Sequence, residues 1–314
     1  MPMKQWQQHA KSALKGVQQS NDFFNTQAFT QAKFPIKIPL QYAGLIDINN
    51  PNDPLLRQVT PQVSASDSKY SLSPLNDESN SPVDGLIHKY PNRVLLIASQ
   101  VCAIHCQYCF RQNFDYSQHD AISNWPAIEQ YIRNHAEINE VILSGGDPLS
   151  LSDQKLEKLI KNIENFNHIT TLRIHSRSMV VIPSRITEYL IKIIAKTRLN
   201  VVLVTHINHA NELSAEFCEN VAKIENATLL NQSVLLNGVN DDLDSLKSLS
   251  LALFDAGILP YYLHMLDKVS GAENYEVSDE KALKLHQQLQ SQLSGYLVPK
   301  LVRDSGLKSK TWLL

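Results

Sequence analysis

Short apolar runs alternate with amphipathic helical patterns from residue 93 to the end of the chain. Runs rich in Val, Ile and Leu predict buried strands, and apolar residues recurring at i, i+3, i+4 and i+7 predict helices. The strands are predicted at 93–99, 140–143, 170–174, 201–204, 228–236 and 258–266. The helical faces are predicted at 156–163, 186–193, 217–224, 246–253 and 281–293, with Ser184 placed to cap the second.

This alternation of strands and helices favours an α/β fold with a parallel sheet. About six repeats without a dinucleotide-binding fingerprint suit a barrel or part of one, with its chemistry at the carboxyl ends of the strands. The cysteine cluster, the segment 144–147, His175 and His206 all fall at such positions. Residues 1–60 are predicted to be partly helical, and 62–82 are rich in Ser, Asp and Asn, as linkers are. We therefore expect an N-terminal extension over 1–85 and a core over 86–314.

The bulk composition is that of an ordinary globular protein, and it contributes mainly by exclusion. The formal net charge is −2, so the bulk charge does not favour binding to nucleic acid or to a membrane surface. The sequence contains neither an apolar run of membrane-spanning length nor an N-terminal signal peptide pattern. These features predict a cytoplasmic protein.

Three of the four cysteines, Cys102, Cys106 and Cys109, follow the first predicted strand with the spacing C-x3-C-x2-C. Thiolates are the usual ligands of iron–sulfur clusters, and three of them leave the fourth iron of a cubane open to a substrate. One alternative is a zinc site completed by His105 or His119. Another is a set of buried cysteines without metal. The remaining cysteine, Cys218, lies beside an apolar helical stripe and is expected in the core.

A glycine-rich segment, SGGDPL at 144–149, follows the second predicted strand. Its two glycines would let the backbone approach a ligand closely. The alternative is an ordinary turn from strand to helix, and the residue types alone do not decide between the two.

The cysteine spacing, with Tyr108 before the last cysteine, resembles the signature of the radical S-adenosylmethionine (SAM) superfamily. Residues from about 85 onward are more closely similar to lysine 2,3-aminomutase, and in particular to the branch that supplies β-lysine for elongation factor P. The matching stretches are 88–93, 109–111, 144–149, 173–177, 231–236 and 260–264, together with 53–59 in the N-terminal region. The resemblance implies a partial (β/α)6 TIM barrel of the radical SAM type. It also implies an isomerase that converts L-lysine to β-lysine.

The resemblance also implies a role for each matching position. Cys102, Cys106 and Cys109 would hold a [4Fe–4S] cluster, and SAM would meet Tyr108, Ser144, Gly145, Gly146, Asp147, Arg173 and Ser176. Pyridoxal 5′-phosphate (PLP) would form a Schiff base with Lys310, near which Lys308 is a rival, and would contact Lys89, Tyr90, Arg93, Gln232 and His264. Arg111 would grip the substrate carboxylate, and Asp267 and Asp304 would bind the far ammonium group. Taken singly, these lysines and acids would be read as solvated surface charges.

The resemblance further implies L-lysine as substrate, an external electron donor of the flavodoxin or ferredoxin type, and a link to elongation factor P and its lysyl ligase. The chain ends at Leu314, where classical members continue into a subunit-joining segment. This suits the shorter branch and weakens an expectation of tetramers. Two alternatives stay open: a sister aminomutase acting on glutamate or arginine, and a zinc-binding structural module.

Overall fold

The protein is built on one large mixed sheet. A computed structural model describes residues 3–31, 34–61, 69–75, 77–116 and 119–304, and the backbone of 311 and 312. In this part of the chain nine strands follow the linear order β11-β10-β9-β8-β7-β6-β5-β4-β3. They are β3 (Leu86–Tyr90), β4 (Arg93–Ser99), β5 (Glu140–Gly145), β6 (Thr171–Ser176), β7 (Asn200–Thr205), β8 (Thr228–Val234), β9 (Leu259–His264), β10 (Lys300–Arg303) and β11 (Thr311–Trp312).

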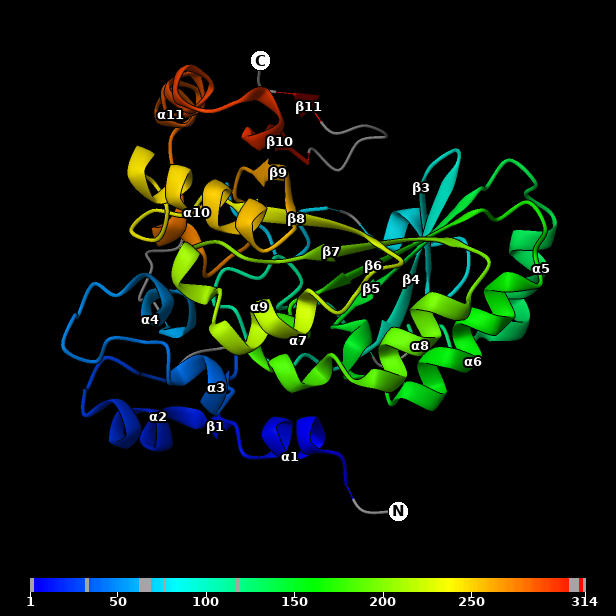
Figure 1. Cartoon of the computed structure of the whole chain (residues 1–314), viewed down its shortest axis with the longest axis horizontal. Helices are drawn as coiled ribbons and strands as arrows, with labels where there is room; N and C mark the ends of the chain where they lie inside the picture. The colour runs from blue at the N-terminus through cyan, green and yellow to red at the C-terminus, as the bar shows by residue number, and fades with distance from the viewer. Residues whose placement is uncertain are drawn as a thin grey trace.

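The sheet is parallel from β4 to β10, and each strand pairs with the next one along the chain. Sequential parallel order is the arrangement of TIM-type barrels, so the predicted α/β fold with a partial barrel is confirmed. The two edge strands, β3 and β11, run antiparallel to their neighbours. Because all the parallel strands end at the same edge, the segments that follow them come together there (Figure 1).

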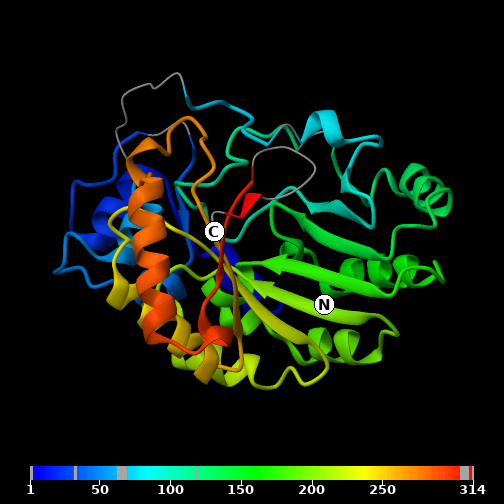
Figure 2. The same cartoon turned by 90° about the horizontal axis from the view of Figure 1, so that it is seen from above.

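Helices connect the strands and cover the sheet (Figures 1 and 2). They are α5 (Trp125–Arg133), α6 (Asp153–Glu164), α7 (Ser178–Val181), α8 (Glu188–Lys196), α9 (Ala215–Val221), α10 (Leu243–Asp255) and α11 (Asp279–Gln292). The predicted cap of α8 is wrong: Thr187 accepts a hydrogen bond from the Leu190 amide, while Ser184 lies in a preceding 3-10 turn. No described helix combines the length and the apolar character that a membrane crossing requires.

Alternate side chains of the parallel strands build the main core. Leu96, Leu143, Ile174 and Leu203 on four neighbouring strands are each fully buried, and the apolar stripes of α5, α6 and α8 pack in the same cluster. Burying a leucine or isoleucine side chain stabilises a fold by roughly 1.5–3 kcal/mol. This core therefore holds the strand ends, and the loops that leave them, in fixed positions.

The N-terminal segment packs against the cysteine loop and not only against itself. It contains α1 (Gln5–Lys11), β1 (Leu14–Lys15), α2 (Gly16–Phe24), β2 (Lys37–Ile38), α3 (Leu40–Ala43) and α4 (Pro54–Val59), and it is drawn in blue in Figure 1. Its apolar cluster includes Ala103, Ile104, Val181 and Ile182 of the later chain. We propose that residues 1–85 form an extension and residues 86–314 a core. Because the two parts share this apolar cluster, we expect them to fold together.

Candidate functional site

The three clustered cysteines lie in the loop after β4, and each is partly buried. Burial raises the pKa of Cys102 well above its ordinary value, and the thiols of Cys109 and Cys106 raise it further. Burial, followed by Cys106, raises the pKa of Cys109 to about 12. The thiols of Cys102 and Cys109, whose pKa values are raised in this way, need nearby positive charge to become thiolates. The donor set therefore fits a cationic iron–sulfur cluster.

The zinc alternative would need at least three protein donors around one ion. In the described ranges no three His, Cys, Asp or Glu side chains converge on one metal-ion position, as a mononuclear zinc site requires. His105 uses its Nδ1 in a hydrogen bond of 3.0 Å to the carbonyl oxygen of Pro35. Cys218 packs against the main core on α9, as expected for a structural cysteine.

The N-terminal segment holds the cysteine loop by hydrogen bonds to the main chain of that loop. The Nζ of Lys37 donates to the carbonyl oxygen of Cys102 at 2.6 Å, and the amide of His105 donates to the carbonyl of Lys37 at 3.0 Å. The amide of Gln107 donates to the carbonyl oxygen of Gln58 at 3.0 Å. Segments far apart in the sequence thus fix the loop from which the three thiols project.

The two glycines at the end of β5, Gly145 and Gly146, are required by close backbone packing against the segment that leads to Cys102. A Cβ on Gly146 would stand 2.7 Å from the carbonyl oxygen of Val101, and one on Gly145 would stand 2.7 Å from that of Ser99. Gly145 also has a φ of +113°, which L side chains rarely adopt. These glycines let the second strand end pass directly behind the cysteine loop.

Asp147 links the ends of β5 and β6. Its carboxylate accepts hydrogen bonds from the Ser176 hydroxyl and from the amides of Leu149, Arg177 and Ser178, at 2.8–2.9 Å. Both residues predicted here for SAM, Asp147 and Ser176, are therefore engaged with each other. Their assignment to SAM stays a prediction.

Tyr108, also predicted for SAM, is buried beneath the loop. Its hydroxyl accepts hydrogen bonds from Arg177 at 2.5 Å and from Asn208 at 2.6 Å, and donates to Gln58 at 3.3 Å. Burial raises the pKa of this phenol well above its ordinary value, so it stays neutral. In the described contacts, Tyr108 thus helps to hold the cysteine loop in place.

One cavity of about 360 Å³ at the strand ends brings together most of the remaining predicted residues. They come from segments as far apart as β3 and the end of β10. The predicted residues that line it are Lys89, Tyr90, Arg93, Arg111, Ser144, Arg173, Gln232, His264, Asp267 and Asp304. Tyr261, Tyr262, His175 and His206 line it as well. Apolar walls with a few convergent polar groups are typical of cofactor and substrate sites.

Two arginines in this cavity are held by acids for which no motif in the sequence predicts a role. Arg111 donates through Nε to Asp77 at 2.8 Å, and its Nη1 lies 3.4 Å from the Ser144 hydroxyl. Arg173 forms an ion pair with Glu140 at 2.5 Å. Asp77 stands in a loop without a motif, so no sequence signal marks it. Glu140 could have been found, because it is the first residue of the buried strand β5, whose neighbour β6 carries Arg173.

Positive charge gathers at the β3–β4 end of the cavity. The guanidinium of Arg93 stacks on the Tyr90 ring at 3.7 Å, and Lys89 forms an ion pair with Asp304. The structure thus pairs a residue predicted for the PLP phosphate with one predicted for the substrate ammonium. The predicted Schiff-base residue Lys310, and its rival Lys308, lie outside the described residues.

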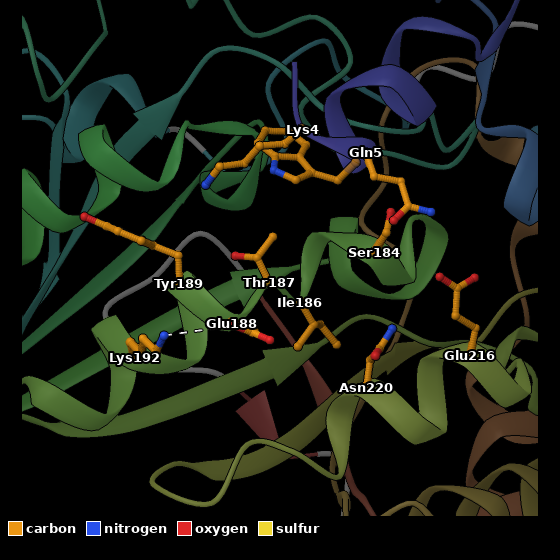
Figure 3. Close-up of a pocket in the computed structure, with 11 residues that line it drawn as sticks. Lys4, Gln5, Ser184, Ile186, Thr187, Glu188, Tyr189, Lys192, Glu216 and Asn220 are labelled. Atoms are coloured by element: carbon orange, nitrogen blue, oxygen red, sulfur yellow. Dashed lines mark ion pairs between the residues drawn. The ribbon is translucent and has the colours of Figure 1, made fainter. Parts of the chain in front are cut away.

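A second and larger cavity, of about 670 Å³, lies on the surface between α1 and α8 (Figure 3). Lys4, Thr187 and Tyr189 line it, and Glu188 and Lys192 form an ion pair of 3.9 Å at its edge. None of its described lining residues belongs to the predicted site. Size therefore does not select the functional cavity here, whereas the convergence of titratable groups does.

Comparison with known proteins agrees with this geometry. The 4Fe-4S single cluster domain family matches residues 92–181, which contain the three cysteines. The L-lysine 2,3-aminomutase of Haemophilus influenzae is 45% identical over 311 residues, which cover 96% of this chain and 91% of that protein. The chain belongs to the L-lysine 2,3-aminomutase family. The L-lysine 2,3-aminomutase of Escherichia coli is 46% identical over 87% of this chain and 81% of its own length.

This member of the lysine 2,3-aminomutase family of radical SAM enzymes is therefore an isomerase, and the matched cluster domain supports a [4Fe–4S] cluster. Among solved structures, a radical SAM methyltransferase from Sphaerobacter thermophilus is similar at a TM-score of 0.49 and 16% identity, over 69% of this chain and 68% of that one. In this chain, the residues predicted to hold the cluster are Cys102, Cys106 and Cys109. The individual positions predicted for SAM, PLP and substrate remain predictions.

Proposed function

We propose that the chain converts L-lysine into β-lysine by moving the amino group from carbon 2 to carbon 3, with PLP bound in the strand-end cavity. The observation that carries the proposal is that the described residues predicted for PLP and substrate all line one cavity of about 360 Å³. Two relatives that are 45% and 46% identical carry the name L-lysine 2,3-aminomutase. A cavity at the strand ends suits radical chemistry, which needs the reacting atoms held close together.

Arg111 would bind the carboxylate of the substrate. Its Nε donates to Asp77, which fixes the plane of the guanidinium, and Arg111 lines the cavity. A guanidinium has five N–H donors, so a bidentate grip on a carboxylate remains possible. The Asp77 carboxylate thus orients Arg111 without using all of its donors.

PLP would lie at the β3–β4 end, where Lys89 and Arg93 supply positive charge for its phosphate and Gln232 lines the wall. When bound, PLP holds the migrating amino group and spreads the unpaired electron of the rearrangement over its ring. We propose Lys310 as the residue that carries it between turnovers. The sequence match alone supports that choice.

The far ammonium group of lysine would meet Asp267, which lies close enough to Cys109 to raise the pKa of that thiol. Asp304 would join it when the phosphate of PLP attracts Lys89 away from the ion pair. Phosphate and ammonium would then replace the Lys89–Asp304 contact by two new pairs of opposite charge. The two acids, Asp267 and Asp304, favour a substrate with a cationic side chain over glutamate.

The finer setting of the reaction is also part of this proposal. Reduction of the cluster needs an external one-electron donor, for which flavodoxin and ferredoxin are the expected types. We propose that the enzyme works in the cytoplasm, where thiols stay reduced. We further propose that β-lysine passes to the lysyl ligase that modifies elongation factor P.

A substrate panel tests this function. Anaerobically reconstituted and reduced protein is offered L-lysine, L-arginine or L-glutamate singly, with SAM and PLP, and the amino acids are separated by chromatography. We expect a 3-amino product from L-lysine alone, and a strong loss of that product in Asp267→Asn with SAM cleavage retained. A product from L-glutamate or L-arginine, with none from L-lysine, would support the sister aminomutase instead.

A further inference from the structure

A buried arginine touches the sulfur of a cluster cysteine. Arg177 follows β6 directly and is 6% exposed. Its Nη1 donates to the Sγ of Cys106 at 2.7 Å. Its Nη2 donates to the carboxylate of Glu212 at 2.8 Å and to the side-chain oxygen of Gln58 at 2.7 Å. The guanidinium therefore spans from a counter-charge on one side to a thiol on the other.

Glu212 is held as firmly as the arginine that it neutralises. It is fully buried, and its other oxygen accepts hydrogen bonds from the Asn208 amide at 2.9 Å and from the Gln58 side chain at 3.1 Å. Burial lowers the pKa of Arg177, but Cys106, Tyr108 and Glu212 together hold it well above its ordinary value. Arg177 is thus a permanent cation in a fixed position.

A purely structural role would not require the contact with sulfur. The chain contains a second buried arginine, Arg185, whose guanidinium pairs with Asp153 at 2.8 Å and donates to the carbonyl oxygens of Leu149 and Leu151. That arrangement ties loops together without a cysteine among its partners in the described contacts. Arg177 combines the same kind of buried ion pair with a donor aimed at Cys106.

Hydrogen bonds to cluster sulfurs and nearby charge are the means by which proteins set the potential of iron–sulfur centres. Reduction adds negative charge to the cluster and its thiolates. A fixed cation and an N–H donor on one thiolate favour the reduced state, and a buried carboxylate behind that cation opposes it.

We propose that Arg177 is a positioning residue that raises the reduction potential of the cluster through Cys106, and that Glu212 moderates this effect. The proposal rests on the assignment of the cluster to the three cysteines, and not on the identity of the substrate. It makes Arg177 the residue that decides how strong the external electron donor must be.

The test uses reconstituted protein in redox titrations followed by electron paramagnetic resonance, without SAM, after iron and sulfide have been counted per chain. The first variant, Arg177→Met/Glu212→Gln, removes both charges so that no buried carboxylate is left alone. The second, Glu212→Gln, removes only the moderating charge. The matched control, Arg185→Met/Asp153→Asn, removes a buried pair that does not touch the cluster.

We expect the first variant to be reduced at least tenfold less favourably than the wild type, which for a one-electron couple appears as about 59 mV. Glu212→Gln should raise the reduction potential of the cluster, and the control should have the wild-type potential. The proposal would be overturned if neither Arg177→Met/Glu212→Gln nor Glu212→Gln changed the reduction potential of the cluster. If the double variant holds no iron, the direction of the Glu212→Gln shift decides. Wild-type protein without iron would instead remove the cluster assignment itself.

Discussion

Four Gly→Ala substitutions separate backbone strain from steric overlap behind the cysteine loop. An alanine Cβ at Gly146 would stand 2.7 Å from the Val101 carbonyl oxygen, whereas at Gly145 a similar overlap adds to a φ of +113°. Gly257 has a φ of +76° but no described atom within 4 Å of the added Cβ. Gly295 has neither feature in the described structure. The four positions thus form a complete factorial design.

The expected costs follow from these geometries. A left-handed backbone conformation costs a non-glycine residue about 1–2 kcal/mol, and forcing atoms into a packed region costs about 1–3 kcal/mol. Gly257→Ala should therefore lose about 1–2 kcal/mol and Gly146→Ala about 1–3 kcal/mol. Gly145→Ala should lose roughly the sum, and Gly295→Ala should stay within about 0.5 kcal/mol of the wild type.

Urea unfolding measures these losses, and iron bound per chain after reconstitution measures their consequence for the site. Gly146→Ala and Gly257→Ala should be destabilised to a similar degree, but only Gly146→Ala should bind less iron, because its new methyl group pushes on the segment leading to Cys102. If Gly146→Ala unfolds like Gly295→Ala and binds full iron, the argument from close backbone approach is wrong.

Three further predictions concern the cavity. Burial lowers the pKa of His206 to about 3 against an ordinary 6.5, so the unfolded chain binds more protons and stability falls as the pH drops below 6.5. Between pH 7 and pH 5 this loss should be about 2 kcal/mol; His206→Gln should remove it in urea unfolding, and an unchanged pH dependence would contradict the assignment. Lys89→Met should weaken PLP binding about tenfold in absorbance titrations, whereas Asp304→Asn should strengthen it by freeing the lysine; shifts of equal sign would argue against a partner exchange. Borohydride reduction and peptide mapping should find PLP on Lys310, and its recovery on Lys308 would correct the match.

The strand and helix pattern was predictable because burial imposes it on the sequence. Strands β4 to β9 and helices α6 and α8 to α11 lie where apolar periodicity predicted them. Strand β3 was missed because it is short and pairs through a tight turn at Pro91 and Asn92, where polar residues hide the alternation. The cap of α8 was misplaced because Pro183 opens a 3-10 turn that delays the helix until Thr187.

The site was predictable where a motif carries it and unpredictable where only the fold assembles it. Spacing marks the cysteines, and the glycines follow a strand, so both stand out. Asp77 is a single acid in a loop and Glu212 a single acid in a 3-10 turn, and their partners Arg111 and Arg177 are distant in sequence. Arg177 lies within a stretch that matched the family, and its position directly after a strand was the available signal. Only tertiary contacts show what it touches.

The fate of one hydrogen atom tests the central claim most directly. L-Lysine deuterated at carbon 3 is incubated with reduced enzyme, SAM and PLP, and the products are analysed by mass spectrometry and nuclear magnetic resonance. The proposed reaction should give β-lysine with deuterium at carbon 2 and SAM with deuterium at the 5′ carbon of its adenosyl group. Neither label should appear with Cys106→Ala. Well-loaded enzyme that forms no β-lysine, or β-lysine without transferred deuterium, would contradict it.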